Sequence, residues 1–257
     1  MHKIIVITGP TAVGKTKLSI ELAKKYDGEI INADAVQVYK GLDIGSAKVT
    51  EEEKEGIPHH LLDFKEVTEE YTIYHYQKDC REKIKDIQSR NKTPILVGGT
   101  GLYIKAALYD YKLSEEKSTN TYDNLTNEEL YEELKKLDKD IIIDKDNRRR
   151  LIRAINYYKE NNESINKNKT NKLLYNVIFI GLTTDRQVLY DKINKRVDEM
   201  ISQGLLEEVK SFYDKGIKSK PLLNAIGYRE LYNYLDGNCT KEEAIETILE
   251  LAELKKE

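Results

Sequence analysis

The feature that most constrains the fold is the stretch GPTAVGKT at residues 9–16 of this 257-residue chain. A short run rich in β-branched residues precedes it at 4–7, and a segment with helical periodicity follows it at 16–26. A glycine-rich turn between a strand and a helix directs backbone N–H groups at an anion, and the helix dipole strengthens the attraction. The spacing Gly-x-x-x-x-Gly-Lys-Thr therefore predicts a phosphate-binding loop. Its residues are Gly9, Pro10, Thr11, Ala12, Val13, Gly14, Lys15 and Thr16.

Two side chains of this loop carry chemistry. We expect Lys15 to place a positive charge on the outer phosphate, and Thr16 to offer its hydroxyl to Mg²⁺, the cofactor that the loop predicts. A chance Gly-Lys-Thr match in a surface loop is the alternative, but the flanking strand and helix disfavour it. The loop predicts phosphate binding and leaves the reaction type open.

The surrounding sequence alternates between strand-like and helix-like segments. Further strands are expected at 28–34, 93–99 and 174–182, and further helices at 74–92 and 102–109. This alternation predicts an α/β fold, with a parallel sheet of the P-loop NTPase type, helices on both of its faces, and ligands at the carboxyl ends of the strands. In the first helix, the residues expected to face the core are Leu18, Leu22, Ala23 and Tyr26.

A change in charge near residue 109 indicates a small all-helical insertion. Acidic residues predominate from 109 to 146, and basic residues from 147 to 172. Thr126 and Glu129 form a capping-box pattern that starts one helix, and the segment 148–158 is read as a second. The expected organisation is the first part of a catalytic core at 1–108, a helical insertion at 109–172, and a return to the core with C-terminal helices at 173–257.

The composition excludes several classes of protein. Charged residues make up 34% of the chain and no apolar run reaches membrane-spanning length, so we expect a cytoplasmic protein without membrane contact. A secretory signal is not expected. Cys80 and Cys239 lie far apart and outside any metal-ligand pattern, so they are read as reduced bystanders. His59 and His60 have no further Cys or His partners, so they are read as structural and zinc is not expected. A monomer is expected, because no apolar stripe remains once the core is assigned.

The residues at the ends of two predicted strands distinguish between possible reaction types. A P-loop hydrolase needs a strand that ends in an Asp near Mg²⁺, but the strand at 93–99 runs into Gly98-Gly99-Thr100, and NKTP at 91–94 lacks the Asp of a guanine-reading motif. A transferase is therefore favoured. Asp34 follows the second strand and is placed to take a proton from a nucleophile, although an Asp in a turn or at a helix N-cap is at least as good a reading of its position.

Six blocks of sequence together resemble one family. They are GPTAVGKT, DAVQVYKGLDIGSAK, PHHLLD, PILVGGTGLYIKAAL, DNRRRLIRAI and NAIGYRELYNYL. In this order they resemble the tRNA dimethylallyltransferases, which prenylate adenosine 37 beside the anticodon, and the likeness covers about 1–108 and 173–240. The resemblance implies dimethylallyl diphosphate as the donor, its diphosphate held by the loop as the leaving group, and the tRNA anticodon stem-loop as the partner.

The resemblance also implies roles for single residues. Asp34 would deprotonate the N6 amine of the adenosine, Arg196 would contact the diphosphate, and Thr100 would lie beside the extruded base. Without the resemblance, Arg196 would be read as a solvated helix charge. Contacts with tRNA are expected from a strand-end segment, from Thr100 and from a basic helix, although clustered arginines usually form a solvated face. The residues are Asp34, Ala35, Val36, Gln37, Thr100, Arg149, Arg150, Leu151, Ile152 and Arg153.

Two departures from the family pattern leave other functions open. Ala35 stands where the family has a serine, and the printed sequence lacks the family's basic C-terminal block, from which we expect weaker tRNA binding with a shallow salt dependence. The alternatives are a prenyltransferase that acts on free AMP, a small-molecule P-loop kinase, and a paralogue that binds without turnover. The identity of the donor and the acceptor that are consumed separates these functions.

Overall fold

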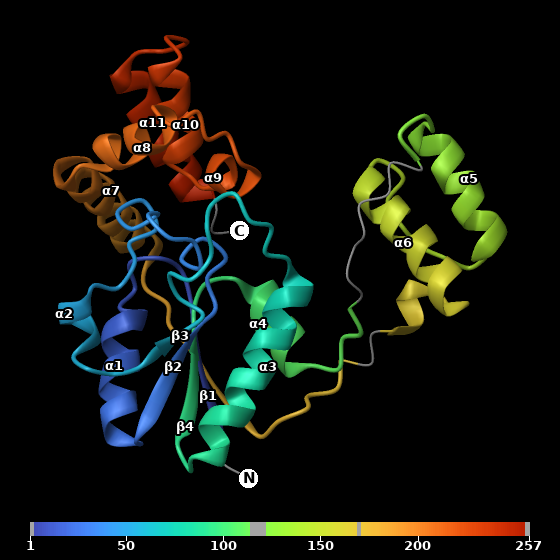
Figure 1. Cartoon of the computed structure of the whole chain (residues 1–257), viewed down its shortest axis with the longest axis horizontal. Helices are drawn as coiled ribbons and strands as arrows, with labels where there is room; N and C mark the ends of the chain where they lie inside the picture. The colour runs from blue at the N-terminus through green and yellow to red at the C-terminus, as the bar shows by residue number, and fades with distance from the viewer. Residues whose placement is uncertain (1–2, 114–121, 169–170, 255–257) are drawn as a thin grey trace.

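The structure is a computed structural model that describes residues 3–113, 122–168 and 171–254 (Figure 1). Its centre is a sheet of five parallel strands in the order β3-β2-β4-β1-β5. The residues of the interior strand β1 from Ile4 to Ile7 are buried on both faces, as a covered parallel sheet requires. The predicted parallel α/β fold is confirmed. The strands are β1 (Ile4–Thr8), β2 (Gly28–Asn32), β3 (His59–His60), β4 (Thr93–Val97) and β5 (Val177–Gly181).

Helices cover both faces of the sheet, as predicted (Figure 1). Ile5 and Ile7 of β1 point to one face and pack in a cluster with residues of α1. Ile4 and Val6 point to the other face and join the main core with residues of α3 and α4. Because successive side chains of a strand point to opposite faces, β1 contributes alternate residues to two separate cores. The helices of this part are α1 (Lys15–Lys25), α2 (Glu51–Lys54), α3 (Ile73–Ser89) and α4 (Gly101–Leu108).

The predicted core face of α1 was wrong at one end. Tyr26 is 48% exposed, whereas Ile20 is buried beside Ala23. The helix ends at Lys25, and Tyr26 is its C-cap with φ of −115°, so the helical period no longer applies to it. The strand β3 was not predicted at all, because two residues show no periodicity. His60 of β3 lies 2.7 Å from the Glu29 carboxylate, which agrees with a structural role.

The insertion is a helical hairpin with its own small core. Leu130 and Leu134 of α5 pack against Leu151 and Ile155 of α6, and all four are fully buried. Figure 1 shows the hairpin standing away from the sheet. Next to the core, the segments before and after the hairpin are joined by a bridge between Tyr109 and Leu173. The elements are α5 (Asn127–Leu137), α6 (Arg148–Asn161) and a 3₁₀ turn (Ile165–Asn168).

Five C-terminal helices lie above the carboxyl ends of the strands (Figure 1). Gly204 separates the first two with a φ of 104°, a conformation that glycine adopts without strain. In the described part of the chain, no helix is long and apolar enough to cross a membrane. The helices are α7 (Arg186–Gln203), α8 (Leu205–Tyr213), α9 (Lys220–Asn224), α10 (Tyr228–Leu235) and α11 (Lys241–Leu254).

Candidate functional site

A cleft of about 1230 Å³ opens at the carboxyl ends of the strands. The glycine-rich loop forms one side, and α7 and α11 contribute an opposite, largely apolar wall. Ligands of open parallel sheets bind at this edge because several loops converge there. Segments that line the cleft are 8–12, 14–17, 34–37, 45–47, 97–100 and 225–227.

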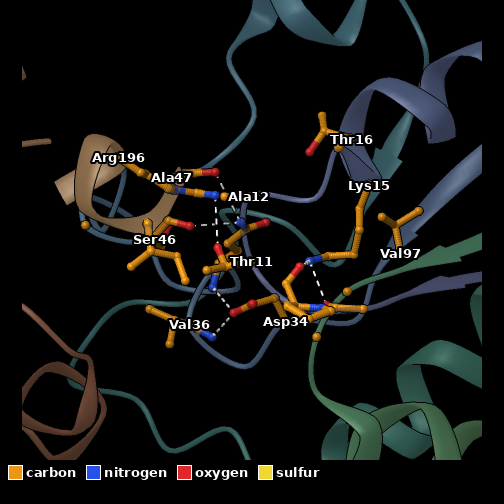
Figure 2. Close-up of a pocket in the computed structure, with 18 of the residues that line it drawn as sticks. Thr11, Ala12, Lys15, Thr16, Asp34, Val36, Ser46, Ala47, Val97 and Arg196 are labelled. Carbon is orange, nitrogen blue, oxygen red and sulfur yellow. Dashed lines mark hydrogen bonds between the residues drawn. The ribbon is translucent and has the colours of Figure 1, made fainter. Parts of the chain in front are cut away.

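The loop between β1 and α1 has the form of an anion site. Gly14 is the N-cap of α1 with a φ of 90°, so the chain turns sharply and α1 begins at Lys15. The Lys15 ammonium donates hydrogen bonds to the carbonyl oxygens of Gly9 at 2.9 Å and Pro10 at 2.6 Å (Figure 2). Burial lowers the pKa of Lys15, the nearby Asp34 carboxylate raises it, and Arg196 lowers it. A partly desolvated cation at a helix N-terminus favours a bound phosphate.

Thr16 is the residue of this loop that suits a metal. It lines the cleft in the first turn of α1. Among the described residues, no group of three or more His, Cys, Asp or Glu could hold a metal ion. Mg²⁺ commonly takes only one or two protein ligands and fills its shell with phosphate oxygens and water. The donor set therefore fits Mg²⁺ brought in with a diphosphate.

Asp34 lies two residues beyond β2, at the mouth of the cleft. Its Oδ1 accepts hydrogen bonds from the backbone N–H groups of Val36 at 2.8 Å and Gln37 at 3.4 Å (Figure 2). The turn reading of this Asp is thus correct. The two contacts use the same oxygen, so the turn orients the carboxylate while its second oxygen takes no part in these two bonds.

Thr100 is held next to the segment that follows Asp34. Its Oγ1 accepts a hydrogen bond from the Ala35 N–H at 3.2 Å, and its own N–H donates to the Ala33 carbonyl at 3.2 Å. This close approach depends on Gly98, because an added Cβ there would lie 2.3 Å from backbone atoms of Ala33. The glycines after β4 therefore bring two strand ends together. Ala35 packs against the main core.

Arg196 comes from α7, far away in sequence, and faces the loop. Its Nη1 donates to Thr11 Oγ1 at 2.9 Å (Figure 2). Burial lowers its pKa, while Asp34 is the largest of the carboxylates that raise it. The reading of Arg196 as a solvated helix charge is wrong. Lys15, Arg196 and Asp34 converge in one cleft.

The Gln37 side chain is oriented by a segment that the sequence did not single out as functional. Its Nε2 donates to the carbonyl oxygens of Ser46 at 3.0 Å and Ala47 at 3.3 Å. These contacts engage the amide nitrogen and leave Oε1 for a partner. Gly45, Ser46 and Ala47 line the cleft. The apolar wall from Ile193, Val197 and Met200 was also missed, because helical periodicity cannot distinguish a cleft wall from a core.

The basic helix lies in the hairpin and outside the cleft. Arg149, Arg150 and Arg153 of α6 are exposed. Leu151 is fully buried in the hairpin core, and Ile152 packs against that core. Leu151 therefore has no surface to offer to tRNA, and its proposed contact is withdrawn. The physical reason is the helical period, which turns Leu151 inward between outward-facing arginines.

Comparisons with known proteins agree with one another. Residues 37–252 match the family model described as IPP transferase. The tRNA dimethylallyltransferase of Anoxybacillus flavithermus is 51% identical over 256 residues, which cover 96% of this chain and 82% of that protein. The full-length tRNA isopentenylpyrophosphate transferase of Bacillus halodurans is similar in structure, with a TM-score of 0.76 and 41% identity over 100% of this chain and 84% of the other. A eukaryotic dimethylallyltransferase acting on tRNA reaches a TM-score of 0.90 at 31% identity, over 99% of this chain and 68% of the other.

Proposed function

Because the chain belongs to the IPP transferase family and is a tRNA-prenylating enzyme, we propose that the cleft transfers a dimethylallyl group from dimethylallyl diphosphate to N6 of adenosine 37. The observation that carries this assignment is that Lys15 of the loop and Arg196 of α7 line the same cleft and both interact electrostatically with Asp34. The two cations can bind the diphosphate leaving group. The carboxylate can accept a proton from the amine that displaces the diphosphate.

The donor side of the cleft neutralises the leaving group. The allylic C–O bond breaks as negative charge develops on the departing diphosphate. Loop N–H groups, Lys15 and Arg196 stabilise this charge without rearranging, since their positions are set before the donor arrives. Mg²⁺ held through Thr16 would add positive charge at the same oxygens. The hydrogen bond from Arg196 to Thr11 keeps the guanidinium at the loop in the absence of the donor.

The acceptor side receives the adenine base. N6 attacks the allylic carbon, a new C–N bond forms, and the N6 proton passes to Asp34. The base must leave its stack in the anticodon loop to reach this point. Thr100 and Gln37 line the cleft together with Asp34, where they position the extruded base. Arg149, Arg150 and Arg153 of the hairpin contact phosphates of the stem-loop.

The proposed function also bears on the cellular location of the enzyme, its oligomeric state and its use of ATP. A tRNA substrate supports a cytoplasmic enzyme. All residues of the proposed site come from one chain, so a monomer is sufficient for the reaction. ATP can occupy the loop through its phosphates, but β4 is followed by Gly98 and Gly99 rather than by the Asp that hydrolysis needs.

The test follows the release of diphosphate from dimethylallyl diphosphate with Mg²⁺. The acceptors are an unmodified anticodon stem-loop, free AMP, and none. We expect release with the stem-loop, a matching gain in RNA mass, and loss of the reaction in EDTA. Faster prenylation of AMP would show a different acceptor. Steady ATP hydrolysis without RNA would instead support a kinase or NTPase.

A further inference from the structure

A carboxylate from the C-terminal helices is bound by the turn at residues 43–45. Glu208 of α8 accepts hydrogen bonds from three successive backbone N–H groups: those of Asp43 at 3.0 Å, Ile44 at 2.8 Å and Gly45 at 3.2 Å. The hydroxyl of Tyr228 donates to the same carboxylate. Hydrogen bonds to an ionised acceptor are roughly twice as strong as those between neutral groups. The turn is thus anchored to a helix more than 160 positions away.

The packing around this turn allows it little freedom. An added Cβ at Gly45 would lie 2.5 Å from the Tyr228 ring, so the backbone rests directly on that ring. On the other side, the Lys48 ammonium forms ion pairs with Asp43 and Asp63, and only 7% of its side chain is exposed. Charged contacts therefore hold the segment at both ends. Its middle, Ser46 and Ala47, lines the cleft.

The anchored segment fixes the orientation of one side chain in the cleft. The carbonyl groups of Ser46 and Ala47 both accept from Gln37 Nε2. An amide whose nitrogen is held by two carbonyls presents its oxygen in one direction. If the turn moved, these carbonyls would move with it, and the amide would be free to rotate. A carboxyl group outside the cleft thus controls a polar group inside it.

We infer that Glu208 is a positioning residue for the acceptor side of the reaction, because it holds the turn that orients the Gln37 amide. The inference rests on the proposed role of Gln37 in receiving the tRNA base. It assigns a function to α8 and α10 that the catalytic residues do not explain. These helices set the geometry of base recognition, whereas the P-loop and α7 set that of the diphosphate.

The experiment compares Glu208→Gln with Glu207→Gln, a matched loss of one charge at an exposed neighbour on the same helix. Steady-state kinetics are measured separately for the anticodon stem-loop and for dimethylallyl diphosphate. Glu208→Gln should raise KM for the stem-loop by roughly 2- to 12-fold, the range for one ordinary hydrogen bond, and leave KM for the diphosphate unchanged. Glu207→Gln should change neither value. Equal changes in both KM values, or a fall in kcat alone, would overturn the inference.

A double-mutant cycle with Gln37→Ala separates positioning from general stability. If Glu208 acts through Gln37, the double variant should be no worse than the poorer single variant, because coupled residues are not additive. Additive losses would overturn the inference. If Gln37→Ala has no effect on the stem-loop, the proposed role of Gln37 fails and the inference fails with it. If Gln37→Ala has an effect and Glu208→Gln has none, only the inference fails.

A milder variant guards against misfolding of Glu208→Gln. Tyr228→Phe removes one hydroxyl that donates to Glu208 and retains the ring on which Gly45 rests. It should raise KM for the stem-loop in the same direction by a smaller factor. An unchanged KM in a folded Tyr228→Phe variant, together with failure of Glu208→Gln to fold, would reduce Glu208 to a stability residue and overturn the inference.

Discussion

Asp34→Asn tests the proposed chemistry most directly, because the structure separates the two tasks of this residue. An amide oxygen can replace Oδ1 as the acceptor for the Val36 N–H at 2.8 Å and the Gln37 N–H at 3.4 Å. The turn should therefore persist. The variant cannot take up the proton from N6. A positioned general base contributes roughly 10²- to 10⁴-fold in rate, so kcat should fall by at least about 100-fold, or about 2.7 kcal/mol of activation free energy.

The substitution also acts on Lys15, and the two effects have different pH dependences. Burial lowers the pKa of Lys15, and the Asp34 carboxylate counteracts part of this shift. Without that carboxylate the pKa of Lys15 falls further, so less of the ammonium form remains as the pH rises. A loss of rate that arises through Lys15 therefore grows with pH. A loss that arises from the missing base is already present at neutral pH.

The assay is single-turnover prenylation of the anticodon stem-loop at saturating donor, across the neutral to alkaline range. Asp214→Asn, the same change at an exposed position after α8, is the control and should leave the rate unchanged. Binding of donor and stem-loop to Asp34→Asn should stay close to that of the unmodified protein. An unchanged turnover at neutral pH would remove Asp34 from the mechanism, and a loss that appears only at high pH would assign its role to Lys15.

Three further predictions concern the scaffold and the hairpin. Gly98→Ala should push the ends of β2 and β4 apart, because the added Cβ would lie 2.3 Å from backbone atoms of Ala33. We expect the free energy of unfolding to fall by about 1–3 kcal/mol and kcat to fall as well. Full activity in this variant would contradict the need for the close approach. Hydrogen bonds from Arg90 hold the pKa of Glu29 at about 2, below the usual 4.5, so the ion pair stabilises the fold above pH 4.5 and is lost as the pH falls toward 2. In Glu29→Gln, the free energy of unfolding should depend less on pH in the acid range, by at most about 3 kcal/mol, because solvent partly screens Arg90. Urea unfolding of both proteins at pH 7 and pH 3 measures this difference. If both proteins lost the same free energy of unfolding at pH 3, the pairing of Glu29 with Arg90 would be refuted. Arg149→Ala should weaken stem-loop binding and reduce the slope of log affinity against log salt by about 0.7 to 0.9, whereas an unchanged slope would place Arg149 away from the phosphates.

Local sequence patterns were sufficient for four of the five strands that the structure describes, for the loop and for the position of the strand-end carboxylate. The loop at 9–16 is read from its own spacing, since the turn, the helix start and the anion site are built from adjacent residues. Buried parallel strands show as continuous apolar runs, which identified β1 and β4. Asp34 was singled out because it lies at a strand end, two residues beyond β2. All of these signals lie within a few residues of the feature that they predict.

Tertiary structure alone decided the features that depend on contacts between distant segments. From its local sequence alone Arg196 would be read as a solvated charge, and only the family resemblance pointed to the diphosphate; in the fold, α7 places it against Thr11, 185 positions earlier in the chain. Leu151 lay within the basic run, but packing against α5 turned it into the hairpin core. The orientation of Gln37 depends on the 43–47 segment, and that segment on Glu208. Periodicity reports which face of an element is apolar, but it does not report which other element covers that face, because this choice is made by the packing of the whole chain.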